Sequence, residues 1–222
     1  MPQSNQRRGT VGVLVEEHFD PDEFRAFNTA LPRQGYAVEY LSRLWGHDSL
    51  TFWSNTERGR AAEHVTVTRD VADADPGTYR GLIAIGGYAM DRLRYQEKVH
   101  GPAEPATAPA VRFLRAAAAT PGLVTGALCH ALWLWCADPE LLRGRRVTCA
   151  HNIVRDVENA GGTVVYADGA TADVVVDGTL VTARHPEVVG EFLRAFTREI
   201  ERNQLVGSAS AATSKGAGHA GR

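Results

Sequence analysis

The chain has 222 residues, of which 44% are hydrophobic and 23% charged, and its formal net charge at pH 7 is -2. This composition is ordinary for a globular protein, and the small net charge gives no electrostatic basis for binding nucleic acid or an anionic membrane. No run of about 18 apolar residues is present, and residues 1–8 lack the apolar centre of a secretory signal, so we expect a cytoplasmic protein without a membrane partner.

The N-terminal part of the chain predicts a β-α-β unit. Residues 10–16 form a nearly continuous apolar run, residues 21–34 carry apolar side chains at helical spacing, and residues 36–42 read as a second strand. Such units are almost always parallel and right-handed. Residues 44–64 hold neither period and should form a loop or hairpin, whereas residues 65–68 alternate like a half-buried strand.

The middle of the chain continues this alternation. Residues 82–85 are apolar and lead through a glycine pair into a short helix at residues 90–96. A Pro-rich loop at residues 101–109 then precedes a helix at residues 111–119.

The C-terminal half begins with a second buried strand at residues 123–128. The elements expected after it are a helix at residues 131–137, a strand at 146–149, a helix at 153–160, a strand at 163–166, a hairpin over 173–182 and an amphipathic helix at 186–202.

Alternating apolar strands and helices predict an α/β fold, with a mostly parallel, doubly wound sheet covered by helices on both faces. Because no linker interrupts the pattern, we expect a single domain over residues 10–203. Residues 1–9 and 204–222 have little to bury and are expected to be disordered.

In a doubly wound sheet, the functional site forms at the carboxyl ends of the strands. This rule brings three segments together: the loop at residues 16–23, the glycine pair Gly86-Gly87 and the dipeptide Cys129-His130. The sequence therefore predicts a site at this edge with a cysteine in it.

Cys129 stands where an apolar strand turns sharply into a helix, as the nucleophile does in a nucleophile elbow. The unpaired N–H groups of the helix should favour the thiolate. The alternative is a buried, inert thiol, which is the commoner fate of an isolated cysteine. Cys136 and Cys149 lie in a predicted helix and strand and read as packing residues, and the spacing of the three cysteines fits neither a zinc site nor a disulfide framework.

A cysteine nucleophile also needs a proton acceptor and donors for an oxyanion. His130 is a candidate base if its ring faces the sulfur, and its backbone N–H together with that of Gly87 could hold the oxyanion. Glu23 could hydrogen-bond the sulfur if one of the two is protonated. Four more acids crowd the same loop, so composition alone does not choose among Glu16, Glu17, Asp20, Asp22 and Glu23.

Several motifs in a fixed order resemble those of the DJ-1/PfpI (ThiJ) family, in its PfpI-like branch with a Cys-His elbow. The resemblance covers about residues 10–200 and rests on Phe19-x3-Glu23, Ile85-Gly-Gly-Tyr-Ala-Met-Asp91-Arg-Leu-Arg94, Gly126-Ala-Leu-Cys-His130, Leu142-Arg-Gly-Arg-Arg-Val-Thr148, Arg155-Asp-Val-Glu-Asn-Ala-Gly161 and Val174-Val-Val-Asp-Gly-Thr-Leu-Val-Thr-Ala-Arg184. It implies a flavodoxin-like sandwich similar to that of class I glutamine amidotransferases.

The resemblance also implies roles for individual residues. Cys129 would be the nucleophile, Glu23 the carboxyl group hydrogen-bonded to it and His130 the following residue of the elbow, with Gly87 and the His130 backbone as the oxyanion hole. Asp91 would be an acid that reaches a histidine of a neighbouring subunit. Members of the family need no metal or organic cofactor, and they form homodimers or hexamers of dimers.

The chain departs from the family pattern near the predicted pocket. Ala131 stands where members commonly have glycine, and the segments 44–64 and 101–109 are longer than in compact members. Loops of this kind often decide the substrate. The candidate substrate-binding residues are Gly86, Tyr88, Trp133, Trp53 and His151. Trp45, His47 and Phe52 could also line the pocket, and these three, like Trp53 and Tyr88, could instead form oligomer contacts or a small satellite core.

The leading functional expectation is a cofactor-independent cysteine enzyme that acts on a small carbonyl compound, of the glyoxalase III or deglycase type, through a hemithioacetal on Cys129. Three alternatives remain. The same site could serve a dedicated hydratase, lyase or thiol-addition enzyme of a biosynthetic pathway, an intracellular cysteine peptidase, or a non-enzymatic redox sensor or chaperone that uses oxidation of Cys129.

Overall fold

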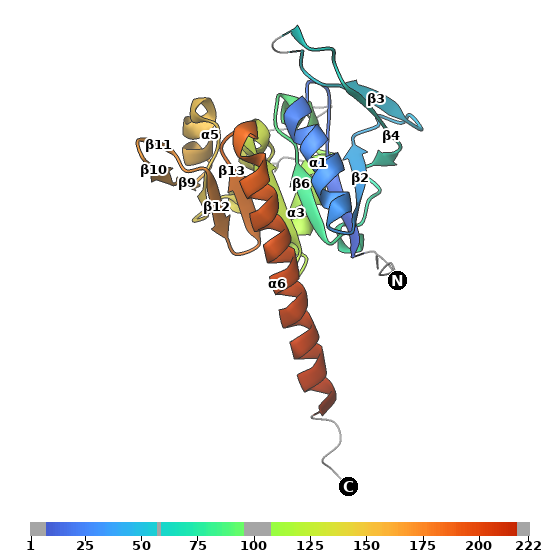
Figure 1. Cartoon of the computed structure of the whole chain (residues 1–222), viewed down its shortest axis with the longest axis vertical. Helices are drawn as coiled ribbons and strands as arrows, with labels where there is room; N and C mark the ends of the chain where they lie inside the picture. The colour runs from blue at the N-terminus through green and yellow to red at the C-terminus, as the bar shows by residue number, and fades with distance from the viewer. Residues whose placement is uncertain (1–7, 57–58, 96–107, 217–222) are drawn as a thin grey trace.

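The computed structural model describes residues 8–56, 59–95 and 108–216. Its centre is a seven-stranded sheet in the order β12-β13-β7-β6-β1-β2-β5 (Figure 1). Neighbouring strands in this sheet run parallel, except that β12 is antiparallel to β13. The strands are β1 (Gly9–Leu14), β2 (Tyr36–Ser42), β5 (Arg69–Asp70), β6 (Gly81–Ala84), β7 (Val124–Leu128), β12 (Val174–Asp177) and β13 (Leu180–Ala183).

Helices cover both faces of the sheet. One face carries α1 (Pro21–Arg33), which packs on β2, and α6 (Val189–Gly216), which packs on β7, β13 and α1. On the other side α2 (Ala89–Leu93), α3 (Pro109–Ala119) and α4 (Trp133–Cys136) contact one another, and α5 (Val154–Asn159) packs on α4. Short 3-10 turns add Pro76–Thr78, Cys129–Leu132, Pro139–Leu141, His151–Ile153 and Pro186–Val188. The predicted doubly wound, flavodoxin-like fold is therefore confirmed.

Three small sheets lie outside the central one. The ribbon of β3 (Leu50–Trp53) and β4 (His64–Val67) is antiparallel. This ribbon is the hairpin that was one of the two possibilities for residues 44–64. The strand expected at residues 65–68 is part of it, as β4, and does not belong to the central sheet. The reason is that these short strands bury few of their residues, as a two-stranded ribbon allows.

The other two small sheets also differ from expectation. β8 (Arg146–Val147) pairs in parallel with β9 (Thr163–Val164), so the strand expected at residues 146–149 is shorter and separate from the central sheet. β10 (Tyr166–Ala167) and β11 (Ala170–Thr171) form an antiparallel hairpin. Strands of two residues carry too few side chains for a period to show in the sequence.

The last helix is longer than predicted. We expected residues 204–222 to be disordered, but α6 continues to Gly216 and its C-terminal half extends beyond the sheet (Figure 1). Part of the segment expected to be disordered is thus helical in the structure. A helix that has already formed extends at little cost through an alanine-containing segment without proline. Residues 217–222, like residues 1–7 and 101–107 of the predicted terminus and loop, lie outside the described residues.

The start of α1 is fixed by local chemistry and sets one side of the site. The side chain of Asp20 accepts hydrogen bonds from the backbone N–H groups of Asp22 and Glu23, and Pro21 stands in the first turn. This cap directs Glu23 inward, where it is fully buried at the carboxyl edge of the sheet.

Candidate active site

Cys129 lies directly after β7, where the chain turns into the 3-10 segment Cys129–Leu132. Its φ of 54° is in the left-handed region that residues other than glycine rarely adopt. Backbone strain of this kind costs about 1–3 kcal/mol and persists where the surrounding structure imposes it. The strained turn is the geometry expected of an elbow, and it leaves the thiol 6% exposed at the base of a cavity.

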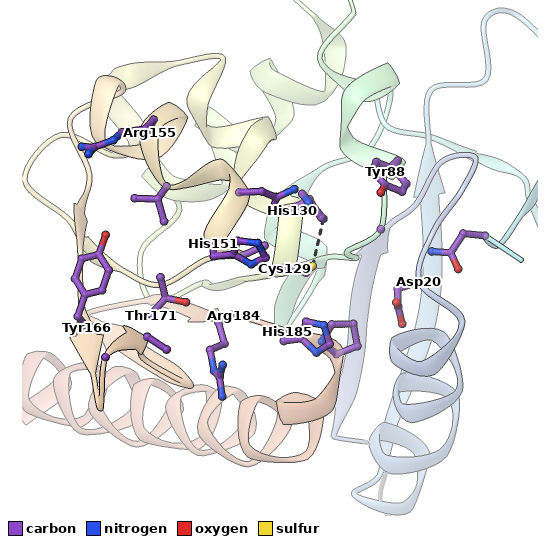
Figure 2. Close-up of a pocket in the computed structure, with 18 residues that line it drawn as sticks. Asp20, Tyr88, Cys129, His130, His151, Arg155, Tyr166, Thr171, Arg184 and His185 are labelled. Atoms are coloured by element: carbon purple, nitrogen blue, oxygen red, sulfur yellow. Dashed lines mark hydrogen bonds between the residues drawn. The ribbon is translucent and has the colours of Figure 1, made fainter. Parts of the chain in front are cut away.

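The ring of His130 faces the sulfur. Its Nδ1 lies 3.2 Å from the Cys129 Sγ (Figure 2). The imidazole stacks on Tyr88, with ring centroids 5.4 Å apart and planes at 25°, and its other neighbour is Trp133, whose centroid is 5.1 Å away. Aromatic rings on two sides therefore hold the imidazole within reach of the thiol.

Two backbone N–H groups converge on the same sulfur, those of His130 and Gly87, and each lowers the pKa of the thiol. The approach of Gly87 depends on its lacking a side chain. Its φ is 78°, and a Cβ at this position would lie 2.4 Å from the carbonyl oxygen of His18 and 2.7 Å from the backbone nitrogen of Asp20. The glycine thus lets an amide come close to Cys129 from the turn after β6.

Glu23 is the acid that the fold places beside Cys129. Its Oε2 accepts the backbone N–H of Gly86 at 2.7 Å, and its buried Oε1 has no hydrogen-bond partner among the described residues. A Cβ on Gly86 would lie 2.5 Å from this Oε1 and 3.0 Å from the Cys129 Cβ, so the two side chains flank the glycine closely. Burial raises the pKa of Glu23 well above its usual value, and the negative charge of Asp20 adds a smaller increase.

The other acids of the loop are engaged elsewhere. Asp20 caps α1, Glu17 accepts the backbone N–H of Trp53 at 3.0 Å, and Glu16 lies 3.7 Å from the guanidinium of Arg92. Asp22 pairs with arginine side chains at the surface. The structure therefore resolves the choice that composition left open.

The Cys129 thiol is not set up as a free thiolate. Burial, followed by the charge of Glu23, raises its pKa to about 12, although the two amides oppose the shift. The amide of His130, at the start of the following turn, favours the thiolate as expected, but α4 has only four residues and sums few peptide dipoles, so burial outweighs this effect. Since burial opposes a negative charge on either group, Cys129 and Glu23 titrate as a coupled pair.

A cavity of about 670 Å³ opens above Cys129 (Figure 2). Among the predicted site residues, Cys129, His130, Gly87, Tyr88 and His151 line it. Sequence reasoning missed much of the remaining lining, which includes Asp20, Asn55, Asn152, Arg155, Tyr166, Thr171, Arg184 and His185.

A sequence signal existed for some of these residues. Arg184 and His185 directly follow β13, a strand whose carboxyl end shares the sheet edge with Cys129, so the strand-end rule applies to them as well. Tyr166 and Thr171 come from the β10–β11 hairpin, whose two-residue strands are too short to show a hydrophobic period.

Three predicted substrate-binding residues do not line the cavity. Trp53 is 46% exposed on the ribbon and packs on His64, with ring centroids 4.9 Å apart, because β3 lies outside the central sheet. Trp133 lies behind His130 and donates its indole N–H to Asp156 at 3.0 Å. Gly86 is buried against Glu23.

Asp91 lies on α2 at the surface, where its carboxylate is 66% exposed and 3.7 Å from Arg94. It lines a second cavity of about 400 Å³ together with Trp45, Arg92 and Tyr95. Within one chain Asp91 thus stays away from the Cys129 cavity, and its role across a subunit interface remains a prediction.

The other aromatic candidates and the remaining thiols are also placed. Phe52 is buried in the core and His47 is exposed at the surface. Cys136 is half-buried and Cys149 buried, and both are free thiols.

Within the described part of the chain, no group of three or more His, Cys, Asp or Glu side chains is placed to hold a metal ion. The helices of that part are also too short or too polar to cross a membrane.

Comparison with known proteins gives a consistent result. The model of the DJ-1/PfpI family matches residues 10–199. An uncharacterized protein of Staphylococcus epidermidis is 28% identical over 191 residues, covering 86% of this chain and 97% of the relative. An uncharacterized protein of Staphylococcus aureus is 26% identical over 191 residues, with 86% and 98% covered.

Solved structures agree in fold. A two-domain protein of Anabaena variabilis with DJ-1/ThiJ/PfpI-like and ferritin-like domains superposes with a TM-score of 0.70 at 24% identity, covering 87% of this chain and 48% of that longer one. Drosophila melanogaster DJ-1beta superposes with a TM-score of 0.65 at 17% identity, covering 91% and 97%.

Proposed function

The chain belongs to the DJ-1/PfpI family, and from this premise and the geometry of the Cys129 site we propose that it is a cysteine-dependent enzyme that acts on a carbonyl compound. The reaction class is that of a glyoxalase III or deglycase. The observation that carries the proposal is the convergence of the His130 imidazole and two backbone amides on one strained thiol, at the base of a cavity large enough for a substrate.

The first chemical step is addition of the thiol to an aldehyde. The sulfur forms a bond to the carbonyl carbon, the C=O π bond breaks, and the thiol proton is transferred to the oxygen, which gives a hemithioacetal. The Nδ1 of His130, 3.2 Å from the sulfur, is placed to accept the thiol proton. The raised pKa of Glu23 allows its carboxyl group to return a proton to the oxygen.

The developing charge on the substrate oxygen needs donors that are in place beforehand. The N–H groups of Gly87 and His130 already converge on the sulfur, so an oxygen bonded to the neighbouring carbon can lie within their reach. Loss of one such donor typically lowers kcat by about 10²–10³-fold.

For methylglyoxal, the later steps balance without an external oxidant. A base moves the proton from the aldehyde carbon to the ketone carbon, so the first carbon is oxidised and the second reduced, and a lactoyl thioester forms on Cys129. Water then cleaves the S–C bond, which releases lactate and restores the thiol.

The direct test is turnover of methylglyoxal to lactate by the purified full-length protein. We expect kcat/KM of about 10⁴ M⁻¹s⁻¹ or higher. Cys129→Ser should abolish this activity without unfolding the protein, while Cys136→Ser, a half-buried free thiol outside the cavity lining, should retain it. Activity that survives Cys129→Ser would remove the nucleophile assignment.

A failed turnover assay would still discriminate among the alternatives. If Cys129 is oxidised to the sulfinate by peroxide in one turnover while aldehydes are untouched, the site is a redox sensor. Cys129-dependent cleavage of a peptide would indicate a peptidase. Cys129-dependent conversion of only larger substrates would indicate a dedicated biosynthetic enzyme.

We further propose that the protein acts as a homodimer or hexamer in which Asp91 reaches a neighbouring subunit's histidine. The exposed position of Asp91 on α2 supports this proposal. Asp91→Asn, which removes the charge and keeps the size, should lower activity in the oligomer. A monomeric protein with undiminished activity in the Asp91→Asn variant would contradict it.

A further inference from the structure

Arg184 and Cys129 leave the sheet side by side. In the parallel pair of β13 and β7, Ala183 lies opposite Leu128, so Arg184 and Cys129 are the first residues beyond the two strands. Neighbouring strands are about 4.8 Å apart, and both residues line the same cavity (Figure 2).

The guanidinium of Arg184 is held on one side only. Its Nε donates to the Oδ1 of Asp173 at 2.6 Å, and the backbone N–H of Arg184 donates to the carbonyl of Asp173 at 3.1 Å. Within the described ranges, its two Nη atoms have no hydrogen-bond acceptor. A fixed guanidinium with free amino groups is suited to bind a carboxylate or a phosphate.

His185, the next residue, adds a second donor. Its Nδ1 accepts the backbone N–H of Glu187 at 3.3 Å, so the neutral imidazole carries its proton on Nε2. The ring lines the cavity, as does the ring of His151 from another part of the chain (Figure 2). Imidazole N–H groups bind anions when neutral and more strongly when protonated.

The cavity lining contains more cationic than anionic side chains, although carboxylates just outside it pair with its arginines. It contains the guanidinium groups of Arg155 and Arg184, and Asp20 supplies its one carboxylate among the described residues. The Oδ1 of Asp20 is occupied by two backbone N–H groups at the start of α1. Two carboxylates pair with the arginines but belong to residues outside the lining, Glu158 and Asp173.

The size of the cavity also favours a substrate larger than a three-carbon compound. Its volume of about 670 Å³ is within the usual range for pockets that enclose whole cofactors or drug-sized ligands, about 300–1,000 Å³. A three-carbon dicarbonyl compound would fill a small part of it. A substrate with a carbonyl carbon at Cys129 and a charged group at Arg184 would use more of the lining.

We propose that the natural substrate of this site is an anionic carbonyl compound, whose carboxylate or phosphate is bound by Arg184 and His185 while its carbonyl carbon lies at Cys129. The reaction at Cys129 rests on the proposed function, but the anion site does not depend on turnover.

The test compares alkylation of Cys129 by iodoacetate, an anion, and by iodoacetamide, its neutral analogue, in the full-length protein. Modification is quantified on the Cys129 peptide by mass spectrometry. We expect the iodoacetate to iodoacetamide rate ratio to exceed that of glutathione by about tenfold at low salt, and to fall towards the glutathione value in 1 M NaCl.

Variants locate the effect. Arg184→Met should lower the rate ratio several-fold, and His185→Gln should lower it independently. The matched control is Arg143→Met, because Arg143 is also an ion-paired arginine but lies outside the cavity lining, and it should leave the ratio unchanged. A ratio equal to that of glutathione, with no response to Arg184→Met, His185→Gln or salt, would overturn the proposal.

One further measurement distinguishes a bound phosphate from a bound carboxylate. A second distinguishes the anion site from the glyoxalase activity. Inorganic phosphate and acetate are compared at equal ionic strength as protectants of Cys129 against iodoacetamide, and the stronger protectant identifies the group bound. Because alkylation needs no turnover, a charge preference without methylglyoxal activity would retain the anion site and reject the glyoxalase. Methylglyoxal turnover without a charge preference in alkylation would retain the glyoxalase activity and reject the anion site.

Discussion

The sharpest structural prediction concerns Gly87→Ala, because the added methyl group meets backbone atoms that have little freedom to move. The Cβ would lie 2.4 Å from the carbonyl oxygen of His18 and 2.9 Å from the carbonyl carbon of Phe19. Gly87 also pairs with Phe19 in an isolated β-bridge, so the two segments are tied together. The methyl group must therefore push the Gly87 amide away from its present position.

The magnitude can be separated into two parts with a matched control. Gly87 has a φ of 78° and Gly144 a φ of 72°, but a Cβ on Gly144 would meet nothing within 4 Å. Gly144→Ala should therefore cost only the left-handed conformation, about 1–2 kcal/mol. Gly87→Ala should cost the same amount plus about 1–3 kcal/mol for overpacking.

Urea unfolding of both variants measures the stability difference, and the rate of methylglyoxal turnover measures the effect on the site. We expect Gly87→Ala to be less stable than Gly144→Ala by about 1–3 kcal/mol and to have lost about 10²-fold in methylglyoxal turnover, because one amide has moved from the oxyanion position. Equal stabilities, or full turnover in Gly87→Ala, would refute the assignment of this amide.

Two further variants test the neighbours of the thiol. Glu23→Gln keeps an acceptor for the Gly86 N–H but cannot ionise. Because the raised pKa of Glu23 makes its ionisation less favourable in the folded state than in the unfolded one, the parent protein should lose stability relative to Glu23→Gln as pH rises above about 4.5; urea unfolding at pH 4.5 and pH 8 that gives the same difference would mean that Glu23 is ionised when folded. Trp133→Phe loses the hydrogen bond to Asp156 and should slow Cys129 turnover by up to about tenfold through poorer positioning of His130, whereas Asp156→Asn, which retains an acceptor, should stay close to the parent rate; an undiminished rate in Trp133→Phe would show that this hydrogen bond does not position His130.

The parts of the fold that could be predicted from the sequence are those in which local pattern and tertiary burial agree. Strands β1, β6 and β7 are buried along nearly their whole length, and the sequence marks them as short apolar runs. The glycine pair Gly86-Gly87 marks the turn after β6, and Cys129 marks the turn after β7. Since parallel strands end at one edge, these marks predict that Gly87, Cys129 and His130 lie close together.

The remaining features depend on contacts that no local pattern records. The two-residue strands β8 to β11 exist because of their pairing partners, and they bring Tyr166 and Thr171 into the cavity. The choice of Glu23 among five acids was decided by the cap that turns its side chain inward. The raised pKa of Cys129 follows from burial, which a sequence does not display.

Burial of the Cys129 thiol and attraction of an anion by the cavity act in the same direction, because burial disfavours a negative charge on the sulfur. A thiolate at the base of the cavity would repel the charge that Arg184 attracts. Burial raises the pKa of Cys129 and of Glu23 and so disfavours the charged form of each group, which limits this repulsion while the substrate binds. The thiol proton then leaves only during addition, when the new S–C bond removes the charge from sulfur and the amides of Gly87 and His130 receive it on the substrate oxygen.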